Sequence, residues 1–364
     1  MFWARLGSLH ALVESAGSPF WKKWLGTKMP SDDSSGRVCA QLNLDDLRKS
    51  LHHIYTRLKR NKALGRIGGL AVAVLDGHET NASYLRHCSG CLERTVHTAT
   101  GDRIQYYHRN VTLMLLGGGL RLLLDMEPQR PGEDEVATAT RLLERVLAAY
   151  PRAFQLLLAD AFYCKAPFVN FLWSHHKYIL VVLKDERRDL YEDVLGLCKI
   201  LKPHEGKFRK RQCLWWDVQN LTTWPQVTSP MRVVRSQETY FVRRQATKEL
   251  TLETSEWMWV TNLPPSLAST ELVVRLGHAR WDIENYGFNE LVNGWHADHV
   301  YKHDPYAIEA LYLVVFIAFN IFHAFLFLNV KPEFRKRKTE AFWIRVFIAE
   351  IYPKGLKNKH VRAP

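Results

Sequence analysis

Residues 70–77 of this chain read LAVAVLDG, an unbroken apolar run that stops at an aspartate, Asp76. A short continuous apolar run bounded by glycine predicts a strand that is buried on both faces of a sheet. A second such run, LLLAD at residues 156–160, also ends in an aspartate, Asp160. Helix-separated strands tend to pair in parallel. If these two strands lie side by side, Asp76 and Asp160 emerge at the same edge of the sheet.

The segments around these runs predict a mixed α/β architecture. Residues 105–126 are expected to form a hairpin, because two strand-like stretches flank a run of glycines. Residues 133–150 are expected to form a helix, with acidic side chains at its N-terminus, where the helix dipole favours them. Residues 178–183 predict another buried strand, and residues 78–102 predict an irregular segment.

The composition is that of a soluble globular protein. Of its 364 residues 47% are apolar and 24% charged, which argues against disorder, a collagen-like fibre and a disulfide scaffold. The length predicts two or three domains. Fifty Lys and Arg against 37 Asp and Glu leave a net charge of +13, which favours a polyanionic partner, either nucleic acid or an anionic membrane. Six cysteines without a signal peptide predict reduced thiols in the cytoplasm.

One segment requires a choice between a membrane span and a core helix. Residues 310–328 are apolar except for Asn320 and His323, and the segment is just long enough to cross a bilayer. A single segment of this kind in a basic chain is more often a helix that is buried on all sides. A buried core helix is therefore the favoured interpretation, and a membrane anchor is the alternative.

Basic residues form several clusters. One lies on an expected helix that begins near Asn43, on the face opposite its apolar leucines, and a solvated surface or DNA contact would explain its charges equally well. Another lies in residues 206–264, whose short alternating pattern predicts a mostly β segment. The candidate DNA-binding residues in these two clusters are Arg57, Lys59, Arg60, Lys207, Arg209, Lys210 and Arg211.

Two further features each leave two interpretations open. Trp215 and Trp216 could stack on an unpaired base, or they could pack within the β-rich segment, which is the more frequent outcome. Cys88 and Cys91 form a CxxC pair with several histidines nearby, among them His108. Structural zinc usually takes four ligands, so one such pair predicts either a zinc site or, more often, two free thiols.

Glu284 is the third carboxylate of interest. It is expected on the apolar face of a helix, together with Trp281, Phe288 and Leu291. A buried carboxylate needs a partner, because leaving its charge unpaired is costly. The simplest partner is Arg280, one turn earlier.

The alternative partner of Glu284 is a divalent cation shared with Asp76 and Asp160. Carboxylate oxygens are the ligands that magnesium prefers in proteins. In a basic protein, such a cluster predicts phosphodiester chemistry by two metal ions about 3.5–4 Å apart.

Several motifs in this chain resemble those of one known family. The run RWDIENYGFNELVNGW, followed by DHVYKHDPYAIEAL, looks like the glutamate signature of bacterial insertion-sequence transposases with an acidic DDE triad. AVLDGHE and LLADAFY resemble the two aspartate motifs of that family, and WMWVTNLP resembles the strand that closes its β-rich insertion. The resemblance covers residues 65–330, with the motifs in the expected order.

This resemblance implies an RNase H-like catalytic domain, which is a mixed sheet with flanking helices, interrupted by a mostly β insertion. It also implies a small helical N-terminal region that contacts transposon ends. The expected domains are 1–66 (helical N-terminal region), 67–205 and 265–330 (the two parts of the catalytic domain), 206–264 (the β-rich insertion) and 331–364 (a basic tail).

The family's catalytic residues carry over to Asp76, Asp160 and Glu284 as the ligands of Mg²⁺, with Mn²⁺ able to substitute, and to Arg280 as the arginine one turn before the glutamate. Two positions depart from the family signature. Gly277 stands where the signature commonly has a tyrosine. Leu291 and Val292 stand where a lysine is common, so that Arg280, His299 or Lys302 would have to supply a cation for DNA.

The implied function is DNA cleavage at transposon ends, followed by attack of the freed 3′-hydroxyl on target DNA. The implied partners are the terminal inverted repeats and target DNA, bound by a homodimer associated with the bacterial nucleoid in the cytoplasm. One alternative is a transposase-derived DNA-binding protein that no longer cuts, which the departures at Gly277 and Val292 favour. Another is a basic protein anchored to the membrane by residues 310–328.

Overall fold

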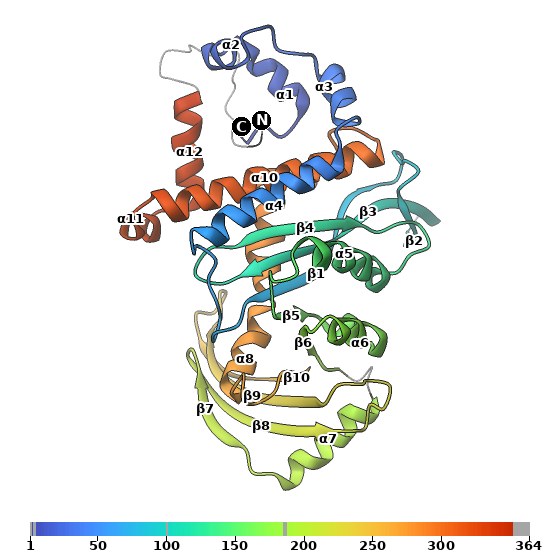
Figure 1. Ribbon diagram of the computed structural model, residues 1–364, viewed down its shortest axis with the longest axis vertical. Coiled ribbons are helices and arrows are strands. Elements are labelled where there is room, and N and C mark those ends of the chain that lie inside the picture. The colour runs from blue at the N-terminus through green and yellow to red at the C-terminus, as the bar shows by residue number, and fades with distance from the viewer. Residues whose placement is uncertain (1, 3–4, 100, 185–187, 352–364) are drawn as a thin grey trace.

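The computed structural model describes residues 2, 5–99, 101–184 and 188–351. Ten strands form one large mixed sheet, with helices packed on both of its faces (Figure 1). The strand order is β2-β3-β1-β5-β6-β10-β9-β8-β7, and β4 pairs with the second half of β3. The strands are β1 (Val72–Ser83), β2 (Leu92–Thr98), β3 (Gly101–Leu116), β4 (Leu122–Pro128), β5 (Leu156–Ala159), β6 (Tyr178–Val182), β7 (His204–Phe208), β8 (Arg211–Leu221), β9 (Met231–Arg243) and β10 (Leu250–Thr261).

The strand predicted from LAVAVL is buried on both faces, as expected. Val72 and Val74 of β1 belong to one hydrophobic core, and Ala73 and Leu75 belong to the core on the opposite face of the sheet. Successive side chains of a strand point to opposite faces, so an unbroken apolar run is required where both faces are covered.

Strands β1 and β5 pair in parallel, with Val72 opposite Leu156 and Val74 opposite Leu158. The same register, continued by two residues, brings Asp76 level with Asp160. Strand β1 nevertheless does not end at Asp76. It runs on to Ser83 because its other edge stays paired with β3, so Asp76 lies inside β1 at the point where β5 stops.

The predicted hairpin of residues 105–126 is confirmed as β3 and β4. The irregular segment predicted for residues 78–102 is wrong in part. The second half of β1 and all of β2 lie there, and β2 pairs with the first half of β3. This end of the sheet is only half-buried, so its strands carry many polar side chains. The sequence there lacks the apolar runs from which a buried strand is predicted.

Residues 206–264 are mostly β-strand. Strand β10 pairs antiparallel with β6, and β9, β8 and β7 follow in order, so these strands continue the central sheet. Helix α7 (Arg188–Ile200) packs against β8. The interpretation of this segment as an insertion remains a prediction.

Helices cover both faces of the central strands. Helices α5 (Glu135–Ala149) and α6 (Ala166–Ser174) contribute to one core, and α8 (Thr270–Ala279), a π-helical turn (Ile283–Phe288), α9 (Asn289–Trp295) and α10 (Pro305–Asn329) contribute to the other. Short 3₁₀ turns lie at Ser15–Gly17 and at Ala161–Tyr163. The terminal segments are helical, with α1 (Leu9–Glu14), α2 (Pro19–Leu25), α3 (Asp32–Cys39), α4 (Leu44–Arg60), α11 (Pro332–Arg337) and α12 (Glu340–Ile351).

The apolar segment of residues 310–328 lies within α10, which packs against α4 and β4 (Figure 1). By length and composition this helix could cross a membrane, and about half of its most apolar stretch is buried inside the protein. The side chain of Asn320 accepts a hydrogen bond from the backbone N–H of Leu123 (2.9 Å) and donates one to its carbonyl (2.7 Å). His323 bonds to Glu290 of α9 (2.9 Å). Both polar residues therefore have partners within the protein.

Candidate active site

The three predicted carboxylates meet in one cleft of about 710 Å³. Asp76, Asp160 and Glu284 come from three separate parts of the chain and line this cleft together. The remaining lining residues are Gly77, His78, Ala161, Val182, Lys184, Trp257, Arg280, Trp281 and Phe288. The two aspartates that the sequence places together at one edge of the sheet therefore line the same cleft.

Backbone hydrogen bonds orient the two aspartates. The Gly77 N–H donates to Oδ1 of Asp76 (2.9 Å). Asp160 caps the 3₁₀ turn that follows β5, where its Oδ1 accepts from the Phe162 N–H (2.9 Å). A carboxylate at the N-terminus of a turn satisfies N–H groups that would otherwise lack partners.

Glu284 lies in a π-helical turn and not in a regular α-helix. The wider turn changes which residues share a face. Phe288 and Leu291 are buried as predicted, whereas Trp281 is 39% exposed and lies at the cleft. Trp281 and Phe288 do line the same cleft as Glu284, and only the expected burial of Trp281 on an apolar face is wrong. π-Turns occur frequently at functional sites.

Arg280 joins two of the three carboxylates. Its Nη1 donates to Oε1 of Glu284 (3.0 Å) and to Oδ2 of Asp76 (3.3 Å). The side chain of Arg280 is 8% exposed, and its guanidinium lies 4.1 Å from the centre of the Trp281 ring. The predicted pair between Arg280 and Glu284 is confirmed, and the same arginine also reaches across to the sheet.

The electrostatics of the cleft favour a cation. The pKa of Asp76 is raised to about 7, chiefly by burial, with the negative charges of Asp160, Glu284 and Glu135 adding to the rise and Arg280 opposing it. One guanidinium therefore does not neutralise the carboxylates around Asp76. A group of carboxylate oxygens of this kind fits a hard divalent cation such as Mg²⁺ or Mn²⁺.

Glu135 is a fourth carboxylate beside this site. It accepts hydrogen bonds from the Tyr163 hydroxyl (2.8 Å) and from Nη1 of Arg109 (2.7 Å). A Cβ atom at Gly77 would lie 2.4 Å from the Glu135 carboxylate, so glycine permits this close approach. The sequence predicted Glu135 only as an acidic residue at a helix N-terminus, because no local pattern indicates that α5 begins against β1.

The departures from the family signature have structural explanations. A Cβ atom at Gly277 would lie 2.2 Å from the ring of Trp259, which fills the space beside this glycine. Leu291 is fully buried, so a lysine at this position would have its charged side chain in the protein interior. Lys184, which follows β6, lines the cleft, and no motif in the sequence indicates this role.

The predicted DNA-binding residues lie in different environments. Arg57, Lys59 and Arg60 are exposed on the last turn of α4. Lys207, Arg209 and Lys210 are exposed around the turn between β7 and β8, whereas Arg211 pairs with Glu238 (2.7 Å). The aliphatic chain of Lys302 lies 3.4 Å from the Cβ position of Gly36 in α3, and Lys302 is not among the residues that line the cleft.

Trp215 and Trp216 are packed inside the protein. They are 6% and 9% exposed, and their indole N–H groups donate to Ser236 and to the Leu201 carbonyl. Base stacking by these two residues is therefore excluded by their burial, and the packing alternative describes them correctly. An exposed aromatic side chain at the cleft is instead that of Trp281.

A family comparison identifies the family of the chain. A family model described as "Transposase DDE domain" matches residues 93–321, which is more than half of the chain. The match contains Asp160 and Glu284, and Asp76 lies before its first residue. No curated protein matches the chain. On the evidence of this match, the chain belongs to the transposase DDE domain family.

Proposed function

We propose that this transposase cuts DNA at the ends of a transposon and joins the freed 3′-hydroxyl to target DNA, with Asp76, Asp160 and Glu284 as its catalytic residues. The observation that carries the proposal is the meeting of these three carboxylates in one cleft of a chain that belongs to the family. Neither aspartate is close to Glu284 in sequence, so only a folded site explains their common location.

In this proposal the three carboxylates hold Mg²⁺, or Mn²⁺ in its place. Such a cation, when bound, polarises a phosphoryl oxygen and lowers the pKa of a coordinated water. Arg280 positions Asp76 and Glu284, because its guanidinium bonds to both. Preorganised charges of this kind contribute to phosphoryl transfer without a covalent protein intermediate.

Other cleft residues would contact the DNA. Lys184 lies at the cleft and can pair with a phosphate, and Trp281 offers an exposed ring on which a base can stack. The turn between β7 and β8 is also close, since Arg209 interacts electrostatically with Asp282, two residues after Arg280. The proposed substrate is therefore double-stranded DNA, bound by two copies of the chain when both transposon ends are paired, in the bacterial cytoplasm.

The test compares alanine variants of the three carboxylates with the wild type on a labelled duplex. The duplex carries the inverted repeat found in the DNA that flanks the gene. With Mg²⁺ or Mn²⁺, Asp76→Ala, Asp160→Ala and Glu284→Ala should each abolish cleavage and leave the gel-shift intact. Glu271→Ala is the matched control, because Glu271 is exposed on the first turn of α8, and this variant should cut normally.

Wild-type cleavage by any one of the three alanine variants would remove that residue from the proposed site. DNA binding by the wild type without cleavage under either metal would instead favour the non-catalytic, transposase-derived DNA-binding protein. Flanking DNA without inverted repeats would point in the same direction.

A further inference from the structure

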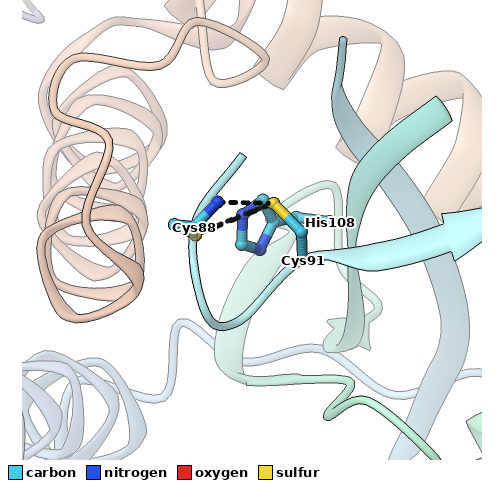
Figure 2. Close-up of side chains that lie close together, drawn as sticks. All are labelled: Cys88, Cys91 and His108. Atoms are coloured by element: carbon cyan, nitrogen blue, oxygen red, sulfur yellow. Dashed lines mark hydrogen bonds between the residues drawn. The ribbon is translucent and has the colours of Figure 1, made fainter. Parts of the chain in front are cut away.

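The two cysteines of the CxxC pair and one histidine form a compact cluster away from the cleft. Figure 2 shows Cys88 and Cys91 on the loop that leads into β2, with their side chains directed toward His108 of β3. The Sγ atoms of Cys88 and Cys91 lie 3.3 and 3.4 Å from Nε2 of His108, and 3.7 Å from each other. Neither thiol is in a disulfide.

These separations match the edges of a zinc coordination tetrahedron. With Zn–S bonds of about 2.3 Å and Zn–N bonds of about 2.0–2.1 Å, tetrahedral angles place two sulfurs about 3.8 Å apart and a sulfur and a nitrogen about 3.5 Å apart. The three ligand atoms of Cys88, Cys91 and His108 thus already have close to the spacing that a shared ion requires.

The backbone of the loop supports this arrangement. The Cys91 N–H donates to the Cys88 carbonyl (3.1 Å), and the Cys88 N–H donates to Sγ of Cys91 (3.2 Å). A Cβ atom at Gly90 would lie 2.9 Å from Cβ of Pro305, the first residue of α10. Glycine therefore allows the loop to approach the start of α10 closely.

We propose that Cys88, Cys91 and His108 bind a structural zinc ion, separate from the oxygen-lined cleft of the proposed active site. Thiolate and imidazole ligands select zinc, whereas carboxylates suit magnesium. Nε2 is the ring nitrogen of His108 that faces both sulfurs, and the buried side chain holds it there. The zinc ion would act on the fold and would take no part in DNA cleavage.

His303 is the candidate for the fourth ligand in this proposal. Its ring nitrogens lie outside the group of ligand atoms within 4.8 Å of one another that Cys88, Cys91 and His108 form, so the ring would have to turn toward the two sulfurs to bind the ion. This histidine lies two residues before Pro305, on the segment against which the CxxC loop packs. Its Nδ1 is buried and has no hydrogen-bond partner within the described part of the chain. The neighbouring Asp304 is occupied, because its carboxylate caps α10 by accepting from the Ala307 N–H (2.8 Å).

A zinc ion held in this way would fasten three elements together. It would tie the loop before β2 and the strand β3 to the segment that enters α10. In the ladder between β1 and β3, His108 lies opposite Thr80, four residues beyond Asp76. The ion would therefore stabilise the half-buried extension of the sheet next to the strand that carries Asp76.

The test measures zinc in the full-length protein, purified without chelator and with any affinity tag removed. Mass spectrometry of the metal content should find one zinc per chain in the wild type and a loss of at least about tenfold in Cys91→Ser and His108→Ala. Cys39→Ser is the matched control, because Cys39 is half-buried in α3 outside the cluster, and this variant should keep its zinc. Chelation should lower the Tm of the wild type and not that of Cys91→Ser.

Cobalt reconstitution keeps the proposal testable if the variants fold poorly. Wild-type protein loaded with Co²⁺ should show thiolate-to-cobalt charge transfer and the visible bands of a tetrahedral site. Absence of these bands, or equal zinc in the wild type and in folded Cys91→Ser, would overturn the proposal. Because neither measurement involves DNA cleavage, failure here is distinguishable from failure of the proposed catalytic function.

The fourth ligand has a separate test. His303→Ala should retain the charge-transfer bands and bind zinc at least about 10-fold more weakly, because loss of a direct ligand should cost no less than loss of a residue that orients one. An unchanged zinc affinity would overturn the assignment of His303 while leaving the other three ligands in place.

Discussion

Asp76 combines burial with a surplus of negative charge, and these two effects oppose its ionisation. Arg280 compensates only in part, since it also pairs with Glu284. The site is therefore destabilising in the absence of a cation, as is common where chemistry requires perturbed pKa values.

The pKa of Asp76, raised to about 7, predicts a pH-dependent stability for the metal-free protein. The carboxyl ionises near pH 4 in the unfolded chain, so the folded state binds an extra proton between about pH 4 and 7 and loses stability as the pH rises through this window. Asp76→Asn should therefore raise the free energy of unfolding at pH 8 by on the order of 2 kcal/mol, with part of the gain offset by the weakened bond to Arg280.

The stabilisation by Asp76→Asn should vanish at about pH 3 and below, where the carboxyl is mostly protonated in both states. Urea unfolding in chelator at the two pH values measures this difference. Equal effects of the substitution at both pH values would show that Asp76 ionises normally.

Gly277 is required by the ring of Trp259, and a side chain there should be costly. In Gly277→Ala the added Cβ would lie 2.2 Å from the Trp259 ring, so overpacking should lower the free energy of unfolding by about 1–3 kcal/mol. Gly196→Ala is the control, because Gly196 lies in α7 with open space around it. There the usual helix preference for alanine should stabilise the protein by about 0.5–1 kcal/mol.

Thermal and urea unfolding of the two glycine variants should therefore give effects of opposite sign. A neutral or stabilising Gly277→Ala would mean that Trp259 moves freely, and that Gly277 has no packing role.

Among the elements, α10 shows how a helix that is apolar enough for a membrane is held in a protein interior. Its buried face contacts α4 and β4, and its polar residues Asn320 and His323 find partners in β4 and α9. The half-buried side chains of Glu309 and Arg48 add an ion pair between α10 and α4. Arg48 also pairs with Asp125 of β4, so this arginine of α4 faces the protein interior.

The contact between α10 and β4 predicts a measurable cost for the loss of Asn320. In Asn320→Ala the N–H and the carbonyl of Leu123 are both left without a buried partner, so unfolding should become easier by about 2–4 kcal/mol. Asn329→Ala is the control, because Asn329 is exposed at the end of the same helix, and it should change stability by less than about 0.5 kcal/mol. Similar unfolding curves for the two variants would contradict this packing of α10.

The whole molecule combines a continuous ten-stranded sheet with a net charge of +13. Two clusters of positive charge are exposed at the end of α4 and at the turn between β7 and β8, and Arg209 of that turn interacts electrostatically with Asp282, two residues before Glu284. This arrangement predicts DNA binding that depends strongly on salt, because each neutralised phosphate releases counterions.

Removal of charge at the β7–β8 turn should reduce that dependence. In a variant with Lys207, Arg209 and Lys210 changed to alanine, the slope of log affinity against log salt should fall by about 0.9 for each phosphate that the turn no longer neutralises. A variant with Lys22, Lys23 and Lys28 changed to alanine removes the same exposed charge elsewhere and should keep the slope. Equal slopes in gel-shift titrations of both variants and the wild type would exclude the turn from the DNA interface.

Local patterns in the sequence were sufficient to predict the elements whose burial is complete. The strands predicted from the apolar runs before Asp76 and Asp160 and the hairpin of β3 and β4 are present, because a strand covered on both faces must be apolar throughout. The helix α10 is also present, but the predicted burial on all sides is wrong in part, since only about half of its most apolar stretch is buried. The same apolar runs also predicted that Asp76 and Asp160 lie close together at one edge of the sheet.

Long-range packing decided the remaining features, and no local pattern encodes it. The continuation of β1 to Ser83 depends on pairing with β3, and Glu135 reaches the site only because α5 begins against Gly77. The approach of His108 to the CxxC loop likewise depends on the register of β2 and β3. Such contacts join residues that are far apart in the chain, so their free energy arises from the folded arrangement as a whole and cannot be read from residue types alone.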